Sequence, residues 1–303
     1  MTTNAVRSCP LCGSSSGDLA FPYATRFNGV DFKYLRCIGC SSVFVDPVPD
    51  DQTFALMYAK DIYHDCHYDG VDETAYHESA HLLREYHADA ETVLDYGCGI
   101  GAFLKALGGE GFKPFGVEFD EDAAKLASKN ANCTVLSVSD FHKLTPPPQF
   151  DVNHLGDVLE HLPEPDITLR ELLAYLKPGG ILFIEGPLEI NPSPVYWAAN
   201  LFGWIKRQLK PATISGHAPT HLFRTGEKQQ KDFFVRVVPN IEITFWQVYE
   251  KGWPYIRGGV VKRFIARTAI LLGGRKINTV TFGNRFKVLL KISNVQVQSK
   301  LDG

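Results

Sequence analysis

The pattern of apolar residues changes character at residue 92. From there on, short runs of apolar and β-branched residues alternate with stretches of helical periodicity. This alternation is typical of a parallel sheet covered by helices on both faces. It predicts seven strands, at residues 92–96, 115–119, 134–137, 152–155, 181–185, 241–246 and 287–292. Ligands bind such sheets at the carboxyl ends of the strands, so the residues after each strand are the first candidates for a site.

The first 90 residues have a different pattern. Residues 43–45 form a short apolar run that Asp46-Pro47-Val48-Pro49-Asp50 ends, because proline cannot donate a backbone hydrogen bond to a sheet. Residues 51–89 have helical periodicity. We therefore expect three parts, namely an N-terminal module (1–48), a helical lead-in (49–90) and an α/β domain (91–303).

Composition places the chain among ordinary globular proteins. Its 303 residues are 45% hydrophobic and 21% charged, which excludes a disordered, collagen-like or coiled-coil polymer. The first ten residues contain no apolar core of a signal peptide, and no run approaches the roughly 18 apolar residues of a membrane span. We expect a cytoplasmic protein.

The net charge of −3 conceals a strong asymmetry. Residues 251–303 hold 11 Lys and Arg against one Asp, whereas the first 250 residues hold 20 against 33 Asp and Glu. The basic segment indicates either a surface for phosphates or anionic lipid, or a solvated face that offsets the acidic body. Within 258–276 an apolar helical stripe lies beside basic residues, and we expect it to pack on the protein's own core or a second subunit rather than on a membrane. The acidic body argues against nucleic-acid binding, and the oligomeric state stays open.

Two C-x-x-C pairs lie near the N-terminus, at Cys9 and Cys12 and at Cys37 and Cys40. Two such pairs can present four thiolates to one Zn²⁺, and metal binding supplies the stability that a module of about 45 residues lacks. A redox pair or iron is the alternative. Four thiolates leave no open coordination position, so we expect a structural zinc ribbon without a catalytic role.

The sequence His77-Glu78-Ser79-Ala80-His81 matches the H-E-x-x-H spacing of zinc proteases. No third ligand follows at a recognisable spacing, and the region is simply rich in histidine. We therefore interpret it as an exposed or partly packed helix face.

A glycine-rich turn, Asp95-Tyr96-Gly97-Cys98-Gly99-Ile100-Gly101, follows the first predicted strand. The spacing differs from the G-x-G-x-x-G fingerprint of dinucleotide-binding folds, which argues against a nicotinamide-dependent oxidoreductase. An acidic residue at Asp95 would repel a diphosphate and would attract a sulfonium or ammonium group.

Further polar residues follow the next strands. Glu118 is placed to accept hydrogen bonds from a ribose diol, and Asp140 and Phe141 offer a carboxylate and a ring to an adenine. Together with the glycine turn, the fourth-strand block at 151–165 and the segment 176–182, these residues resemble the class I S-adenosylmethionine-dependent methyltransferases. The resemblance covers roughly residues 90–295. It implies a seven-stranded, doubly wound Rossmann-like α/β fold.

The resemblance also implies roles for individual residues. Asp95, Gly97 and Gly99 would surround the methionine moiety, Glu118 would bind the ribose, Asp140 and Phe141 would bind the adenine, Gly156 would line the pocket, and Phe119 would also contact the cofactor. In the fourth predicted strand, Asn153 and His154 stand where the family has apolar residues. The N-terminal module looks like the zinc module of a subset that methylates sugars or nucleotide-linked sugars.

Three histidines are candidates for the general base of methyl transfer to a hydroxyl. His217 and His221 lie in a polar loop after the fifth strand, and the block at 221–225 resembles the histidine loop of the zinc-module sugar methyltransferases. We rank His221 first, with capping of the following helix as its structural alternative. His161, in the Glu160-His161 pair, is the alternative candidate for the base.

We therefore expect an enzyme that methylates a hydroxyl of a sugar, nucleotide-linked sugar or glycan intermediate. Carbon methylation of a keto-sugar is less favoured, because Thr220 stands where carbon-methylating relatives have glutamate. The rival from another class is a non-catalytic binding module on the same fold.

Overall fold

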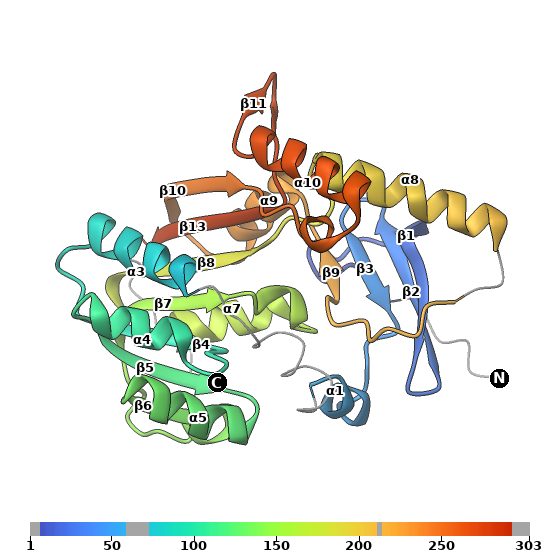
Figure 1. Ribbon diagram of the computed structural model, residues 1–303. Coiled ribbons are helices and arrows are strands. Elements are labelled where there is room, and N and C mark those ends of the chain that lie inside the picture. Colours follow the sequence, from blue (N-terminus) through green and yellow to red (C-terminus); the bar gives the residue numbers. More distant parts are fainter. Residues whose placement is uncertain (1–6, 59–72, 211–213, 293–303) are drawn as a thin grey trace.

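The computed structural model describes residues 7–58, 73–210 and 214–292. A seven-stranded sheet forms the centre of the larger part, and a four-stranded sheet lies beside it (Figure 1). The large sheet contains β4 (Thr92–Tyr96), β5 (Lys113–Glu118), β6 (Thr134–Ser137), β7 (Phe150–Gly156), β8 (Leu176–Pro187), β10 (Ile241–Tyr249) and β13 (Arg285–Ile292), in the order β10-β13-β8-β7-β4-β5-β6.

All seven predicted strands are present, which confirms the fold class. The order reverses beside β4, as expected for a doubly wound sheet. One expectation needs correction, since β13 runs antiparallel to both β8 and β10. The sheet is therefore mixed rather than purely parallel.

Alternating side chains bury both faces of this sheet. Val93, Val152 and Phe183 pack toward one group of helices, whereas Leu94 and Ile184, on the opposite face, pack toward another. The first face is covered by α3 (Thr74–Tyr86) and α4 (Ala102–Gly109), next to α5 (Glu121–Ala131). The second is covered by α6 (Val138–Phe141), α7 (Pro165–Leu173) and α9 (Glu227–Val237). The carboxyl ends of the parallel strands β4, β7 and β8 lie side by side at one edge of the sheet, where the sequence predicted a site.

The N-terminal module is an antiparallel sheet of β1 (Ser16–Phe27), β2 (Val30–Cys37) and β3 (Val43–Asp46). Asn28 and Gly29, both at positive φ, form the tight turn between β1 and β2. The fourth strand, β9 (Phe223–Arg224), comes from the far end of the chain and pairs with β3. Phe44 also shares one hydrophobic core with Leu94 and Ile184 of the large sheet. The predicted boundary near residue 48 therefore separates stretches of sequence but not packing units.

The lead-in supplies α1 (Asp51–Met57), capped by the Asp50 carboxylate, and α3. Part of the histidine-rich region between these two helices, including His64, Cys66 and His67, lies outside the described residues. The remaining elements are α8 (Pro194–Leu209), α10 (Val260–Leu272), the short helices η1 (Leu159–His161) and η2 (Tyr255–Arg257), and a hairpin of β11 (Lys276–Ile277) and β12 (Val280–Thr281). None of the helices among the described residues is long and apolar enough to span a bilayer.

Candidate active site

The glycine-rich turn after β4 has the backbone shape that only glycine adopts easily. Gly97, Gly99 and Gly101 all have positive φ, and a side chain at Gly101 would meet the backbone of Ala127 at 2.9 Å. The backbone N–H of Gly99 donates to Glu118 Oε2 at 2.7 Å. The acid at the end of β5 thus lies against the turn after β4, as a shared cofactor site requires.

Glu118 is also held from its own side, because Oε1 accepts the backbone N–H groups of Phe119 and Asp120 at 2.8 and 3.2 Å. Burial raises the pKa of Glu118, and these backbone donors offset part of that rise. The carboxylate is fixed in place before any ligand binds.

The structure separates the two aromatic candidates of the cofactor site, Phe141 and Phe119. Phe141 is fully buried, with its ring 4.5 Å from Tyr175 and 5.9 Å from Phe115, so it belongs to the core and offers no free face. The predicted role of Phe141 is corrected on this point. Phe119 is 69% exposed beside Glu118 and has an open ring face. Asp140 is exposed and pairs with Lys143 at 2.9 Å, and its role, like that of Gly156, stays a prediction.

Asp95 has a cationic partner within the protein. Its carboxylate is only 3% exposed and lies 2.7 Å from Nδ1 of His154. Burial alone would lower the pKa of His154, but Asp95 and Glu185 outweigh it and raise the pKa to about 9. We predicted a sulfonium or ammonium ligand for Asp95, and the cation that faces it in the structure is protonated His154.

The buried polar cluster that contains Asp95 and His154 also includes Glu185 of β8 and Lys287 of β13. Glu185 Oε2 lies 3.9 Å from His154 Nε2, and Oε1 lies 3.1 Å from Lys287 Nζ and accepts the Ser79 hydroxyl at 2.6 Å. These cations overcome the effect of burial and lower the pKa of Glu185 to about 2. Two buried acids and two buried bases therefore balance one another beneath the glycine turn.

The two unusual polar residues of β7 are thus accounted for. Asn153 donates to the Leu172 carbonyl at 2.7 Å, and His154 joins the two acids. Each also keeps one buried polar atom without a hydrogen-bond partner, Oδ1 of Asn153 and Nε2 of His154.

A second cluster contains two of the three predicted bases. His161 follows β7, Glu189 follows β8, and His221 lies just before β9. The His161 and His221 rings are 4.8 Å apart, and Nδ1 of His221 lies 2.9 Å from Glu189 Oε2. Nδ1 of His161 lies 2.8 Å from the Thr220 carbonyl and 2.9 Å from the Tyr58 hydroxyl. In both rings, Nδ1 faces an oxygen atom. Nε2 is therefore the nitrogen of each ring that can contact a further group.

The environments of these histidines push their pKa values apart. Burial would lower the pKa of His221, but the Glu189 carboxylate outweighs it, so the pKa is raised above the ordinary value. Burial and the nearby His221 lower the pKa of His161 to about 3. His221 is therefore the stronger base of the two.

His217 does not join this cluster. Its side chain is exposed, and its backbone carbonyl accepts the Thr25 hydroxyl of β1 at 2.5 Å. The alternative role of His221 as a helix cap also fails, since the N-cap of α9 is Gly226, and the N–H groups of Gly226 and Glu227 donate to the side chains of Gln229 and Asn191.

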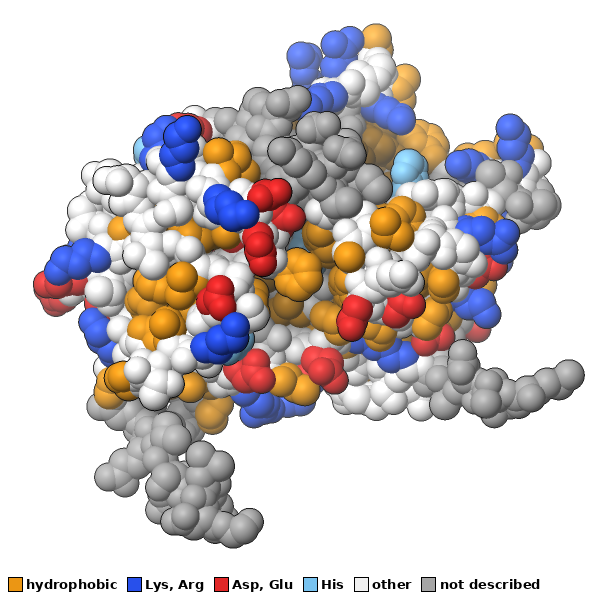
Figure 2. All heavy atoms as spheres, turned by 90° about the horizontal axis from the view of Figure 1, so that it is seen from below, with side chains coloured by type: hydrophobic (Ala, Val, Ile, Leu, Met, Phe, Trp, Pro, Cys, Tyr) orange, Lys and Arg blue, Asp and Glu red, His pale blue; other side chains and the backbone are white. Residues whose placement is uncertain are grey.

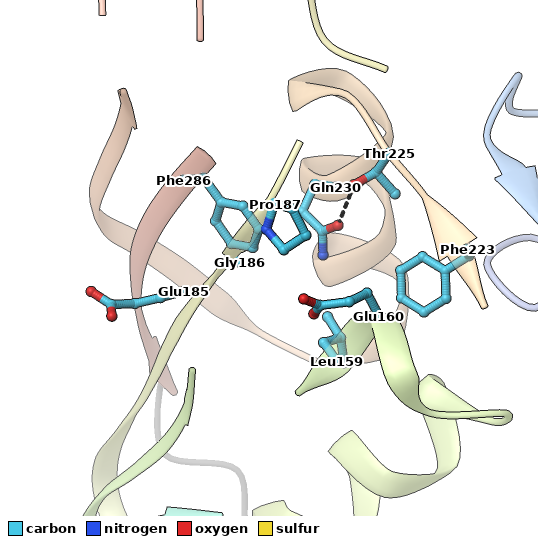
Figure 3. Close-up of a pocket in the computed structure, with 9 residues that line it drawn as sticks. All are labelled: Leu159, Glu160, Glu185, Gly186, Pro187, Phe223, Thr225, Gln230 and Phe286. Atoms are coloured by element: carbon cyan, nitrogen blue, oxygen red, sulfur yellow. Dashed lines mark hydrogen bonds between the residues drawn. The ribbon is translucent and has the colours of Figure 1, made fainter. Parts of the chain in front are cut away.

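A small cavity lies beside Glu160 of the second polar cluster. It is lined by Leu159, Glu160, Glu185, Gly186, Pro187, Phe223, Thr225, Gln230 and Phe286, and Figure 3 shows Glu160 and Gln230 pointing toward one another across it. Glu160 Oε1 and Gln230 Nε2 are buried without a hydrogen-bond partner. Burial raises the pKa of Glu160 to about 7. The Glu160 carboxyl also lies 3.8 Å from His161 Nε2 and so belongs to the second polar cluster.

Seen from below, the molecule is hollowed between its two halves, with apolar and acidic side chains around the hollow (Figure 2). In the second polar cluster, Glu160, His161 and His221 bring potential ligand atoms within 4.8 Å of one another.

The His77 and His81 side chains, by contrast, are exposed on α3, and His81 faces Glu110 at 3.8 Å. This position agrees with our rejection of a protease site.

The four predicted zinc ligands come together in the N-terminal module. Their sulfur atoms all lie within 4.8 Å of one another, with 3.3 Å between Cys12 and Cys37 and 3.7 Å between Cys9 and Cys40. A tetrahedral Zn²⁺ with bonds of 2.3 Å separates its sulfurs by about 3.8 Å. The donor set and its spacing therefore fit zinc.

Sequence reasoning missed the partners that hold the histidines, chiefly Glu189, Glu185 and Lys287. Glu189 stands two residues after β8, at the carboxyl edge where we expected ligands, so its position was a usable signal. Lys287 carried no signal, because it lies inside an apolar strand.

Residues 68–206 match a family model described as a methyltransferase domain. The matched segment therefore resembles methyltransferase domains and covers slightly less than half of the chain. Proteins named ubiquinone biosynthesis O-methyltransferase match it in part. The one from Azoarcus sp. (strain BH72) is 33% identical over 99 residues, which are 31% of this chain and 42% of that protein. The one from Stutzerimonas stutzeri (strain A1501) is 30% identical over 118 residues, covering 37% and 49%. The chain thus spans less than half the length of these curated relatives.

Solved structures show the same fold at low identity. The mitomycin 7-O-methyltransferase has 16% identity and a TM-score of 0.50, over 79% of this chain and 60% of that one. An S-adenosylmethionine-dependent methyltransferase from Archaeoglobus fulgidus has 22% identity and a TM-score of 0.44, over 71% and 94%. The segment matched by the family model, 68–206, contains the glycine turn, Glu118 and His161, whereas His221 lies beyond it.

Proposed function

We propose that the protein is an S-adenosylmethionine-dependent methyltransferase that methylates a hydroxyl of a small-molecule acceptor, with His221 as the general base. The observation that carries this proposal is the His221–Glu189 pair, whose Glu189 follows β8 at the carboxyl edge of the sheet that also holds the glycine turn after β4. An enzyme at this edge can bring an acceptor and a cofactor together.

The residues after β4 and β5 would hold the cofactor. Glu118 would accept hydrogen bonds from the ribose diol, and the exposed ring of Phe119 would cover the adenine with Asp140 nearby. Gly97 and Gly99 leave room for the methionine moiety, and Gly156 would line the pocket. The cofactor supplies an activated methyl group.

The chain's own contribution is alignment and removal of a proton. An alcohol is a weak nucleophile until its proton leaves, so a neutral His221 would accept that proton at Nε2 as the carbon–oxygen bond forms. Glu189 holds the ring at Nδ1 and stabilises the imidazolium that results, as an acid does for histidine in a hydrolase triad. His161, with its low pKa, stays neutral and does not compete for the proton.

The acceptor class rests on two lines of support. The names of the curated relatives favour oxygen methylation in ubiquinone biosynthesis. The cysteine module beside the histidine loop supports a sugar or nucleotide-linked sugar hydroxyl, which we retain as the proposal. Parallel assays with a nucleotide sugar and a catechol-type quinone precursor separate the two classes, and detection of no turnover on any acceptor would favour the non-catalytic binding module.

We also propose one structural Zn²⁺ held by Cys9, Cys12, Cys37 and Cys40. It would take no part in the chemistry, because four thiolates fill its coordination sphere. Its role would be to hold β1–β3 and, through β3, the strand that follows His221.

Replacing Glu118 with Ala tests the cofactor site. The loss of a charged, two-pronged hydrogen bond to the ribose costs about 1.5–3 kcal/mol, so the dissociation constant of S-adenosylmethionine should rise roughly 10- to 150-fold. Calorimetry measures this directly. Glu121→Ala, in the exposed first turn of α5, is the matched control and should bind normally. Equal affinity in Glu118→Ala and the parent would remove Glu118 from the site.

A further inference from the structure

Helices α8 and α10 lie side by side on the side of the molecule away from β6 and α5 (Figure 1). They contact each other through small and medium side chains, with Ala266 and Ala269 of α10 buried against Val195 and its neighbours on α8. The larger apolar residues are therefore left for the outer surfaces of both helices.

These outer surfaces are strongly apolar. On α10, Val260, Phe264 and Leu271 share one helix face and are 75%, 71% and 64% exposed. On α8, Trp197, Leu201 and Trp204 follow the i, i+4, i+7 spacing of one face and are each more than half exposed. Trp253, before η2, is 68% exposed. We predicted that the α10 stripe packs on the protein's own core or on a second subunit, and the exposure of these side chains rules out the first alternative for them.

The charged residues on these two helices and in the segments that flank them along the chain are all basic. No Asp or Glu occurs in residues 190–226 or 251–301. Exposed basic residues surround the helices, namely Lys206, Arg207, Lys210, Arg257, Lys262, Arg263, Arg267, Arg275 and Lys276. Among the described residues, none of these nine has an ion-pair partner. The face seen in Figure 2, from the opposite side, has acidic and basic side chains intermingled.

We propose that the α8–α10 face docks on the surface of a bilayer that contains anionic lipid. Apolar side chains flanked by unpaired Lys and Arg fit the boundary between acyl chains and acidic headgroups. Neither described helix is long enough to cross the bilayer, so both lie in its plane. The acidic remainder of the chain is repelled by the same surface, which orients the protein with this face down.

Charge also argues against a second copy of this chain as the occupant. A two-fold interface places the same patch on both sides, so the basic residues of one copy would face those of the other. An anionic bilayer supplies the opposite charge instead.

Flotation of the full-length protein with vesicles tests the proposal. The probes are pure phosphatidylcholine and phosphatidylcholine with about one third phosphatidylglycerol. We expect binding to the anionic vesicles, at least tenfold weaker binding to the neutral ones, and release at high salt. The double substitutions Phe264→Ser with Leu271→Ser, and Arg263→Glu with Arg267→Glu, should each weaken binding about tenfold or more.

The control variants change similar exposed residues elsewhere, namely Leu126→Ser with Val235→Ser and Lys125→Glu with Lys129→Glu, and should bind as the parent does. Circular dichroism and cofactor binding show that every variant is folded. Failure of the parent to bind anionic vesicles overturns the proposal. A dimer in light scattering that Phe264→Ser with Leu271→Ser converts to a monomer, without vesicle binding, assigns the face to a second copy. Neither result bears on whether the protein transfers methyl groups in solution.

Discussion

Replacing His221 with Ala is expected to lower methyl transfer by roughly 10²–10⁴-fold while leaving S-adenosylmethionine affinity unchanged. The reason is that His221 is the basic member of its cluster, held by Glu189 at 2.9 Å, and lies outside the turn that would bind the cofactor. A methyl-transfer assay and calorimetry on the same preparation measure the two effects separately. His217→Ala is the matched control, because His217 lies in the same loop with an exposed side chain. Undiminished transfer by His221→Ala would move the role of base to His161.

The same assignment predicts a pH dependence. His221 accepts a proton only when neutral, and Glu189 raises its pKa above the ordinary 6.5. The rate should therefore rise with pH through a value above 6.5 and level off at higher pH. Glu189→Gln removes the negative charge, lowers the pKa of His221 and should shift this rise to lower pH. A pH profile identical in Glu189→Gln and the parent would contradict the pairing.

The fold could be predicted because apolar periodicity reports burial directly. Seven largely apolar strands and the helices between them leave a pattern that can be recognised without any knowledge of contacts. The direction of β13 could not be predicted in this way. Its run of Val288, Leu289 and Leu290 looks the same whether the strand runs parallel or antiparallel, because alternation encodes the faces of a strand and not its direction.

The candidate site was predictable where spacing along the chain defines it and unpredictable where packing does. The glycine turn and the four cysteines are local patterns. The partners Glu189 for His221 and His154 for Asp95 come from separate strands and depend on register. Phe141 shows the opposite error, since a ring at the right place in the sequence points into the core. Sequence position selects the edge of the sheet, and packing then decides which side chains face it.

The pairing of β9 with β3 gives the cysteine module a role beyond its own stability. Val45 of β3 donates its N–H to the Leu222 carbonyl at 2.9 Å, and Phe44 pairs with Phe223, so this strand holds the two residues after His221. On the other side, the Leu222 N–H donates to the Glu160 carbonyl at 2.8 Å. His221 is therefore positioned between the N-terminal module and η1.

Substituting Cys37 and Cys40 together with Ser should abolish zinc binding, which elemental analysis of the parent is expected to show at one ion per chain. Structural zinc contributes on the order of 10 kcal/mol in small modules, so β1–β3 should lose their fold and the thermal stability of the chain should fall. Because β3 then no longer holds the strand after His221, methyl transfer should drop as far as in His221→Ala. Cofactor binding should survive, since Glu118 and the glycine turn lie on the other sheet. Cys133→Ser, a partly buried cysteine on the far edge of the domain, is the matched control and should keep zinc, stability and activity. A metal-free double variant with full stability would remove the structural role of zinc, and one with lowered stability but full activity would remove only its link to His221.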